Sequence, residues 1–110
     1  MTTTDRELLE RAAKAAGYSI RFTSDGTCFR DGPDWMGQWS PLEDDGDALR
    51  LMVRLNMNVF QAGKSAYALP SDDDGTYEEQ VRYTDAADDP YAATRRAIVR
   101  AAAAMAGEGE

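Results

Sequence analysis

Clustered carboxylates are the groups in this sequence whose type and spacing could do chemistry. Asp44 and Asp45 lie in one turn, and Asp72, Asp73 and Asp74 lie in another. Neighbouring carboxylates can bind a divalent cation, transfer protons or attract a basic partner. The second cluster lacks the alternating acids and the distal glutamate of an EF-hand loop. We interpret Asp44 and Asp45 as helix-capping residues and expect no metal at either cluster.

Other catalytic groups are scarce. The chain has no histidine and a single cysteine, Cys28, which excludes ordinary zinc sites, Ser-His-Asp triads and Cys-His dyads. The triplet Gly63-Lys64-Ser65 resembles the end of a P-loop, but Asn58 stands where that motif requires its first glycine. We interpret the triplet as an interruption or bulge in a strand. The sequence therefore predicts no cofactor and no catalytic residue.

The net charge of −8 constrains the partners that the protein can have. Nucleic acids and anionic membrane surfaces attract basic faces, so we expect neither to bind directly. The sign of the charge favours a partner with a basic surface, although excess acid also keeps a small protein in solution.

Two tryptophans lie four residues apart in a segment that glycine and proline interrupt at four positions, which we expect to be irregular over residues 31–41. Trp39 adjoins the next predicted helix and is expected in the core. Trp35 is the better candidate for an exposed aromatic anchor that contacts a partner.

Three amphipathic helices and two strand pairs must position these groups. Thr4 and Glu7 form a capping box for a helix over 5–16, which Gly17 ends. A second helix is expected near 46–55, and Asp89-Pro90 begins a third, which Gly107 closes. Alternation of apolar and polar residues predicts strands at 18–22, 28–30, 57–69 and 77–83.

The predicted fold is a single α+β domain over residues 1–110, with 107–110 as a loose tail. Its order is α-β-β-α-β-β-α, with an antiparallel sheet of about four strands covered by helices. We expect the segment 39–55 to organise the core, because it holds the longest apolar cluster: Leu42, Ala48, Leu49, Leu51, Met52, Val53 and Leu55.

The location of the protein is predicted from what the sequence lacks. It has no run of eighteen apolar residues and no basic and apolar signal at its N-terminus. A lone cysteine suits a reducing compartment. We expect a cytoplasmic protein.

Several stretches resemble the phage ABA-sandwich domain family, small proteins encoded by tailed bacteriophages and prophages. The resemblance covers most of the chain and adds little at 59–83. It implies a phage origin and an α+β fold, and it brings no activity, cofactor or catalytic residue with it. The residues that carry it are Asp5-Arg6-Glu7-Leu8-Leu9, Ala12-Ala13, Ala15-Ala16-Gly17, Trp39-Ser40-Pro41-Leu42, Asp44-Asp45-Gly46-Asp47-Ala48-Leu49-Arg50-Leu51 and 93–102.

The leading hypothesis is a non-enzymatic phage accessory protein that binds and modulates a host protein, for example a defence or nucleic-acid-binding factor. One alternative is a small carboxylate- or metal-dependent enzyme of phage nucleotide metabolism. Another is a structural or assembly protein that self-associates into a homo-oligomer. The predicted partner-binding residues are Trp35, Asp44, Asp45, Asp72, Asp73 and Asp74.

Overall fold

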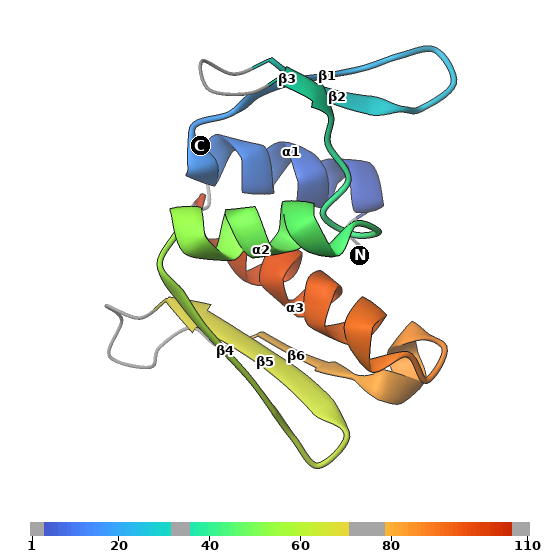
Figure 1. Cartoon of the computed structure of the whole chain (residues 1–110), viewed down its shortest axis with the longest axis vertical. Coiled ribbons are helices and arrows are strands. Elements are labelled where there is room, and N and C mark those ends of the chain that lie inside the picture. The colour runs from blue at the N-terminus through green and yellow to red at the C-terminus, as the bar shows by residue number, and fades with distance from the viewer. Residues whose placement is uncertain (1–3, 32–35, 71–78, 107–110) are drawn as a thin grey trace.

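The computed structural model describes residues 4–31, 36–70 and 79–106. Within these ranges three α-helices and six strands follow one another, with one short 3-10 helix before the last α-helix (Figure 1). In chain order they are α1 (Asp5–Ala16), β1 (Ser19–Phe22), β2 (Cys28–Asp31), β3 (Met36–Gln38), α2 (Asp45–Arg54), β4 (Met57–Ala62), β5 (Ser65–Pro70), β6 (Glu79–Arg82), η1 (Tyr83–Ala86) and α3 (Pro90–Met105).

The helices form a layer between two sheets, as Figure 1 shows. One sheet has the order β1-β2-β3 and the other the order β4-β5-β6, and all neighbouring strands are antiparallel. The α+β class is confirmed. The predicted order is close to the observed one and differs in the number of strands, because the described strands form two separate sheets of three and not one sheet of about four.

The third strand of the first sheet comes from the segment that was expected to be irregular. Met36, Gly37 and Gln38 pair with β2, and the Trp39 amide extends the pairing by donating to the Cys28 carbonyl at 2.9 Å. Backbone pairing needs no particular side chain, so the glycine and proline signals around β3 conceal it. The Trp39 side chain is 2% exposed, which confirms its place in the core.

Helix α1 has the predicted bounds and caps. The Glu7 amide donates to the Thr4 hydroxyl at 3.1 Å, and the Thr4 amide donates to the Glu7 carboxylate at 3.0 Å. Gly17 then takes the left-handed conformation, with φ of 78°. These contacts satisfy backbone groups that a helix leaves free at its two ends.

Helix α3 forms the centre of the molecule, and this corrects the expectation that the segment 39–55 organises the core. It packs against α1, α2 and both β5 and β6. Alanines on several of its sides let these neighbours approach closely, whereas Tyr91 in its first turn is 69% exposed. The buried residues of α3 are Ala93, Ala97, Ile98, Val99, Ala101, Ala102 and Ala103.

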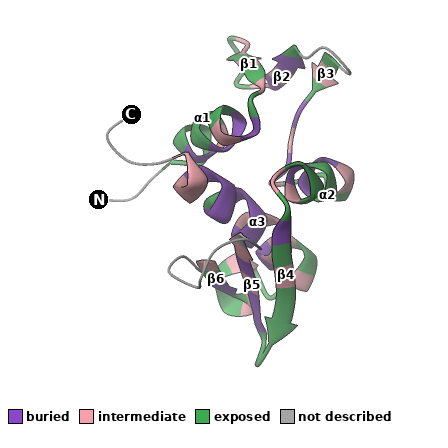
Figure 2. Cartoon of the chain, turned by 90° about the vertical axis from the view of Figure 1, so that its left-hand side faces the viewer, coloured by how far each residue is buried: buried purple, intermediate pink, exposed green. Residues whose placement is uncertain are grey.

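Helix α2 is more peripheral than its apolar sequence suggests. Leu51 is completely buried, but Leu49 and Val53 are 55% and 67% exposed. Figure 2 shows this mixture of buried and exposed residues along α2. The core therefore uses one side of α2 and leaves an apolar flank in contact with solvent.

Gly63 and Lys64 form the turn between β4 and β5. Their φ angles are 57° and 60°, and Ala62 pairs with Ser65 on either side of them. Two successive positive φ angles define a two-residue type I′ hairpin turn. The P-loop interpretation stays rejected, and the interruption is a hairpin turn.

Candidate functional site

The acidic excess of the chain is unevenly distributed. The described residues hold twelve basic and thirteen acidic side chains, a net charge of −1, whereas the whole chain carries −8. Most of the net negative charge therefore belongs to segments outside the described residues. The acids in those segments are Asp34, Asp72, Asp73, Asp74, Glu78, Glu108 and Glu110.

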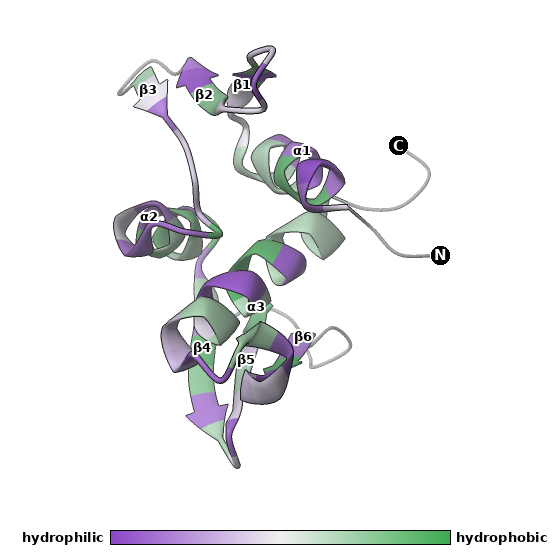
Figure 3. Ribbon diagram, turned by 90° about the vertical axis from the view of Figure 1, so that its right-hand side faces the viewer, coloured by the Kyte–Doolittle hydropathy of each residue, from purple (hydrophilic) through white to green (hydrophobic). Residues whose placement is uncertain are grey.

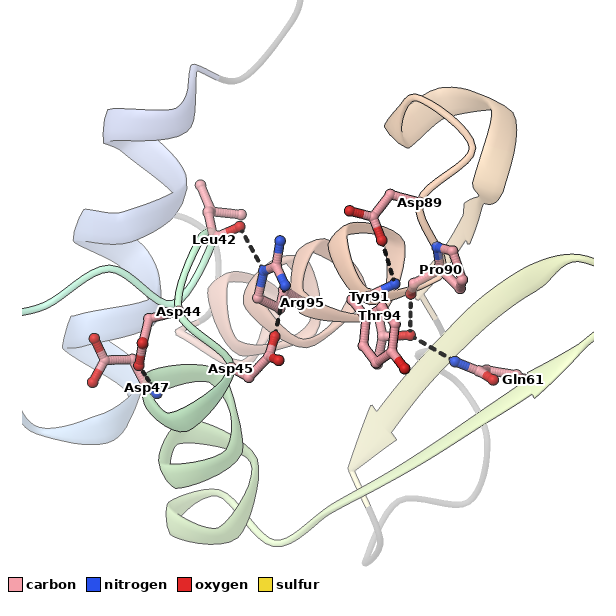
Figure 4. Close-up of polar contacts among 10 residues, drawn as sticks. All are labelled: Leu42, Asp44, Asp45, Asp47, Gln61, Asp89, Pro90, Tyr91, Thr94 and Arg95. Carbon is pink, nitrogen blue, oxygen red and sulfur yellow. Dashed lines mark hydrogen bonds and ion pairs between the residues drawn. The ribbon is translucent and has the colours of Figure 1, made fainter.

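Asp44 caps α2, as predicted. Its carboxylate accepts the Asp47 amide at 2.8 Å (Figure 4). The buried Asp47 carboxylate in turn accepts the Ser40 amide at 2.9 Å and the Arg50 guanidinium at 2.7 Å. These acids hold the start of the helix in place, where the helix dipole favours negative charge.

Asp45 joins α2 to α3. Its carboxylate lies 2.6 Å from the Arg95 guanidinium, which also donates to the Leu42 carbonyl at 2.9 Å (Figure 4). The Asp45 side chain is nevertheless 71% exposed, so it is accessible to a partner.

Trp35, Asp72, Asp73 and Asp74 lie outside the described residues. The described residues on either side of 71–78 are Pro70 and Glu79, and Pro70 pairs with Met57 directly after the C-terminal end of α2. Asp44 and Asp45 lie at the other end of α2. The structure therefore does not bring the flanks of the 72–74 cluster next to the Asp44 and Asp45 turn.

A groove of about 300 Å³ opens beside that turn, between α1, the β1–β2 turn and the segment that leads into α2. Asp5, Asp25 and Glu43 supply three carboxylates from these three elements. The described residues that line it include no lysine or arginine. The other lining residues are Leu9, Gly26, Thr27, Cys28, Gln38, Trp39, Ser40 and Leu42.

Local hydrogen bonds hold two of the three carboxylates. The Thr23 hydroxyl and then the Thr27 amide donate to the Asp25 carboxylate, and they hold the pKa of Asp25 below its ordinary value. The Ser40 hydroxyl lies 3.1 Å from the Glu43 carboxylate. Asp25 therefore keeps its charge to a lower pH than an ordinary aspartate.

Asp5 has a cationic partner on α3. Its carboxylate lies 3.1 Å from the Arg96 guanidinium, in a pair whose side chains are 62% and 33% exposed. The Arg96 cation offsets part of the Asp5 charge, so Asp5 contributes less negative potential to the groove than an unpaired carboxylate would.

The chemistry available in the groove is limited by its cysteine and by the spacing of its acids. Burial raises the pKa of the Cys28 thiol to about 11, so the nucleophilic thiolate is scarce at neutral pH. Over the three described ranges, no group of three or more Cys, Asp or Glu side chains lies close enough to hold a metal ion.

Sequence reasoning missed the groove because its acids are far apart in the chain. Asp5 and Asp25 belong to no cluster, and they meet Glu43, which adjoins Asp44 and Asp45 in sequence, only when α1, the β1–β2 turn and the turn before α2 pack together. Aspartate at 25 is a usual turn residue and gives no separate signal of binding.

Neither the lengths of the described helices nor the similarity to known proteins assigns a function to the groove. No helix within the described ranges is long and apolar enough to cross a membrane. The chain matches no protein-family model, no curated protein and no solved structure.

Proposed function

We propose that this chain is a phage-encoded accessory protein that binds and modulates a host protein through an acidic surface, without catalysing a reaction. The partner has a basic surface, as a defence or nucleic-acid-binding factor would, and the binding takes place in the host cytoplasm. The phage origin depends on the resemblance to the phage ABA-sandwich domain family, and the charge of −8 favours a basic partner.

The groove is the observation that carries this proposal. Its carboxylates surround apolar side chains, Leu9 and Leu42 among them, and the described lining includes no lysine or arginine, so only Asp5 is paired with a cation, Arg96 of α3. A lysine or arginine side chain needs such a combination, because its aliphatic stem packs on apolar surface while its charge meets a carboxylate. Asp44 and Asp45 lie next to Glu43 and widen the acidic surface.

The first experiment measures binding of a short lysine- and arginine-containing peptide by isothermal titration calorimetry. The variant carries Asp25→Asn and Glu43→Gln, which remove two rim charges and preserve side-chain size. Each rim charge contributes of the order of 0.5–1 kcal/mol, so we expect about tenfold weaker binding and a smaller dependence on salt.

The matched control carries Asp85→Asn and Asp88→Asn, which change the net charge equally at positions outside the groove. Asp88 has φ of 60°, and asparagine tolerates this conformation. Equal weakening in both variants would show that the attraction follows net charge alone and would contradict a specific groove.

The same pair of variants identifies the host partner. Capture from a host lysate should retain one basic protein on the wild type and the control, and lose it on the groove variant. Titration of labelled duplex DNA should show no binding at physiological salt, because the proposed partner is a protein.

The concave position of three carboxylates favours one second candidate, a carboxylate-dependent enzyme of phage nucleotide metabolism. Nucleotide turnover by the wild type that disappears in the groove variant and persists in the control would replace the binding proposal.

A further inference from the structure

The first sheet, β1-β2-β3, is attached to the helices less extensively than the second. All three strands of the second sheet pack against α3, and β4 also packs against α2. The first sheet meets the helices mainly where β1 packs against α1. Figure 3 shows this sheet at one end of the molecule, with the helices between it and the second sheet. Its attachment therefore depends largely on one strand and one helix.

Burial differs between the two sheets in the same way. The described strands β1 and β3 contain no fully buried residue, and β2 buries Cys28 and Arg30. The second sheet buries Ala66, Ala68 and Val81 almost completely. Regions with few buried apolar contacts open at a lower free energy than the core of the same protein.

The first sheet has hydrogen bonds of its own that do not involve the helices. The Trp39 amide donates to the Cys28 carbonyl at 2.9 Å, and the Thr23 amide donates to the Thr27 carbonyl at 2.9 Å. These bonds connect neighbouring strands of the sheet. They break when the sheet unfolds, and their loss leaves the backbone of the helices unchanged.

Both ends of the first sheet are anchored to helices. The Tyr18 amide donates to the Ala13 carbonyl of α1 at 2.9 Å, and the Ser40 amide donates to the Asp47 carboxylate of α2 at 2.9 Å. The rings of Tyr18 and Trp39 meet edge to face, with centroids 5.8 Å apart. The chain therefore leaves the helices and returns to them at one place, and the sheet between these anchors can unfold without moving either helix.

The side chains that hold the first sheet to α1 are partly exposed. Ile20 and Phe22 are half-buried at the edge of the core, and the Arg6 guanidinium lies 4.3 Å from the centroid of the Phe22 ring. A cation–π contact at an exposed site is weak. Three short strands need a packed face to be stable, so a sheet that separates from α1 loses its own structure as well.

We propose that the first sheet opens as one unit by local unfolding while α3 and the second sheet stay folded, and that this opening dismantles the groove. The effect on binding rests on the proposed function, because a basic ligand that contacts both Asp25 and Glu43 binds the closed form. The first sheet and its β1–β2 turn supply the following groove residues: Asp25, Gly26, Thr27, Cys28 and Gln38.

The test labels Cys28, the single thiol of the chain, with a disulfide reagent over a range of urea concentrations. The control is Val99→Cys in a Cys28→Ala chain, because Val99 is completely buried in α3 and is reached only by global unfolding. Each rate is divided by the rate of the same chain unfolded in urea. We expect Cys28 to react at least about tenfold faster than the control and with a smaller dependence on urea. Equal rates and equal urea dependence would overturn the proposal.

Val81→Ala separates opening of the first sheet from unfolding of the whole chain. Val81 is buried in β6, and Figure 1 shows the second sheet across the helices from the first. Its contacts persist in the proposed open state, so the labelling rate of Cys28 should not change. The Val99→Cys control should react about tenfold faster, because the substitution removes two buried carbon atoms. Equal acceleration of both thiols would mean that Cys28 reacts through global unfolding and would contradict the proposal.

Amide hydrogen exchange measures the same opening in the unmodified chain. The Thr23 and Trp39 amides should exchange with the free energy obtained from Cys28 labelling, whereas the Val99 amide should exchange with that of global unfolding. Thr23 and Trp39 amides that are as protected as the Val99 amide would overturn the proposal, even if the Val99→Cys chain did not fold.

The lysine- and arginine-containing peptide tests the effect on binding. At a hundred times its Kd it should slow the labelling of Cys28 about a hundredfold. A peptide that binds in calorimetry and leaves this rate unchanged would overturn the link between the sheet and the groove. A peptide that does not bind would instead contradict the proposed function, since the opening of the sheet is measured on the free chain.

Discussion

Arg95 of α3 and Asp45 of α2 connect the central helix to the start of the peripheral one. Their charged groups are 2.6 Å apart, and the Arg95 Nε also donates to the Leu42 carbonyl at 2.9 Å. The Arg95 side chain is 16% exposed, whereas that of Asp45 is 71% exposed. Asp45, predicted as a partner-binding residue, therefore has an intramolecular contact in the structure.

Arg95→Ala should lower the free energy of unfolding by about 1–3 kcal/mol. Most of the loss comes from the half-buried hydrogen bond to Leu42, because water screens the exposed Asp45 carboxylate. Urea denaturation measures the change. Arg82→Ala is the control, since the Arg82–Asp85 pair has both side chains more than half exposed and should contribute less than about 0.5 kcal/mol. Equal losses would mean that the Leu42 bond adds nothing.

Local signals predicted much of the fold. The capping box at Thr4 and Glu7, the Gly17 ending and the Asp89-Pro90 start of α3 depend on neighbouring residues, and the structure has all of them. Alternation likewise predicted β1, whose Ile20 and Phe22 are less exposed than Ser19 and Arg21. Such patterns act within one or two turns of chain and are visible in sequence.

The features of the fold that the sequence did not predict depend on long-range packing. The separation into two sheets depends on which element each strand meets, and the place of α3 depends on alanines that carry little apolar signal of their own. Leu49 and Leu51 look equivalent in sequence, yet one is 55% exposed and the other buried. The groove unites Asp5, Asp25 and Glu43 across three elements, so no local pattern could indicate it.

That contrast within α2 gives a matched test of the core. Leu51→Ala should lower the free energy of unfolding by about 2–5 kcal/mol, because it leaves a cavity at a fully buried position. Leu49→Ala makes the same chemical change at an exposed position and should change stability by less than about 0.5 kcal/mol. Both are measured at a chain concentration at which the protein is monomeric. Similar losses would contradict the burial of Leu51.

The hairpin turn provides a test of backbone strain. A Cβ at Gly63 would meet no atom within 4 Å, so Gly63→Ala acts only through its φ of 57° and should cost about 1–2 kcal/mol. Lys64→Ala keeps a Cβ at a similar φ and should change little. Thermal denaturation of the two variants measures this difference. Equal melting temperatures would argue against a type I′ turn.

Cys28 should make stability fall at alkaline pH. Burial raises the pKa of its thiol to about 11 in the folded chain, against an ordinary value of 9.0. Between these values the unfolded chain loses the thiol proton and the folded chain keeps it, so rising pH favours unfolding. The stabilising effect is complete below about pH 9 and is lost as the pH rises towards 11.

Comparison with Cys28→Ala isolates this effect, because tyrosine and lysine titrate in the same range in both proteins. The measurement is the change of melting temperature with pH from 8 to about 11, so any constant loss from the substitution itself cancels. We expect the wild type to lose stability more steeply than the variant above pH 9 and the two slopes to agree below it. Parallel curves throughout would mean that the thiol ionises as readily in the folded chain as in the unfolded one. Cys28 would then be open to solvent from the groove, and its reactivity there would have to be measured directly.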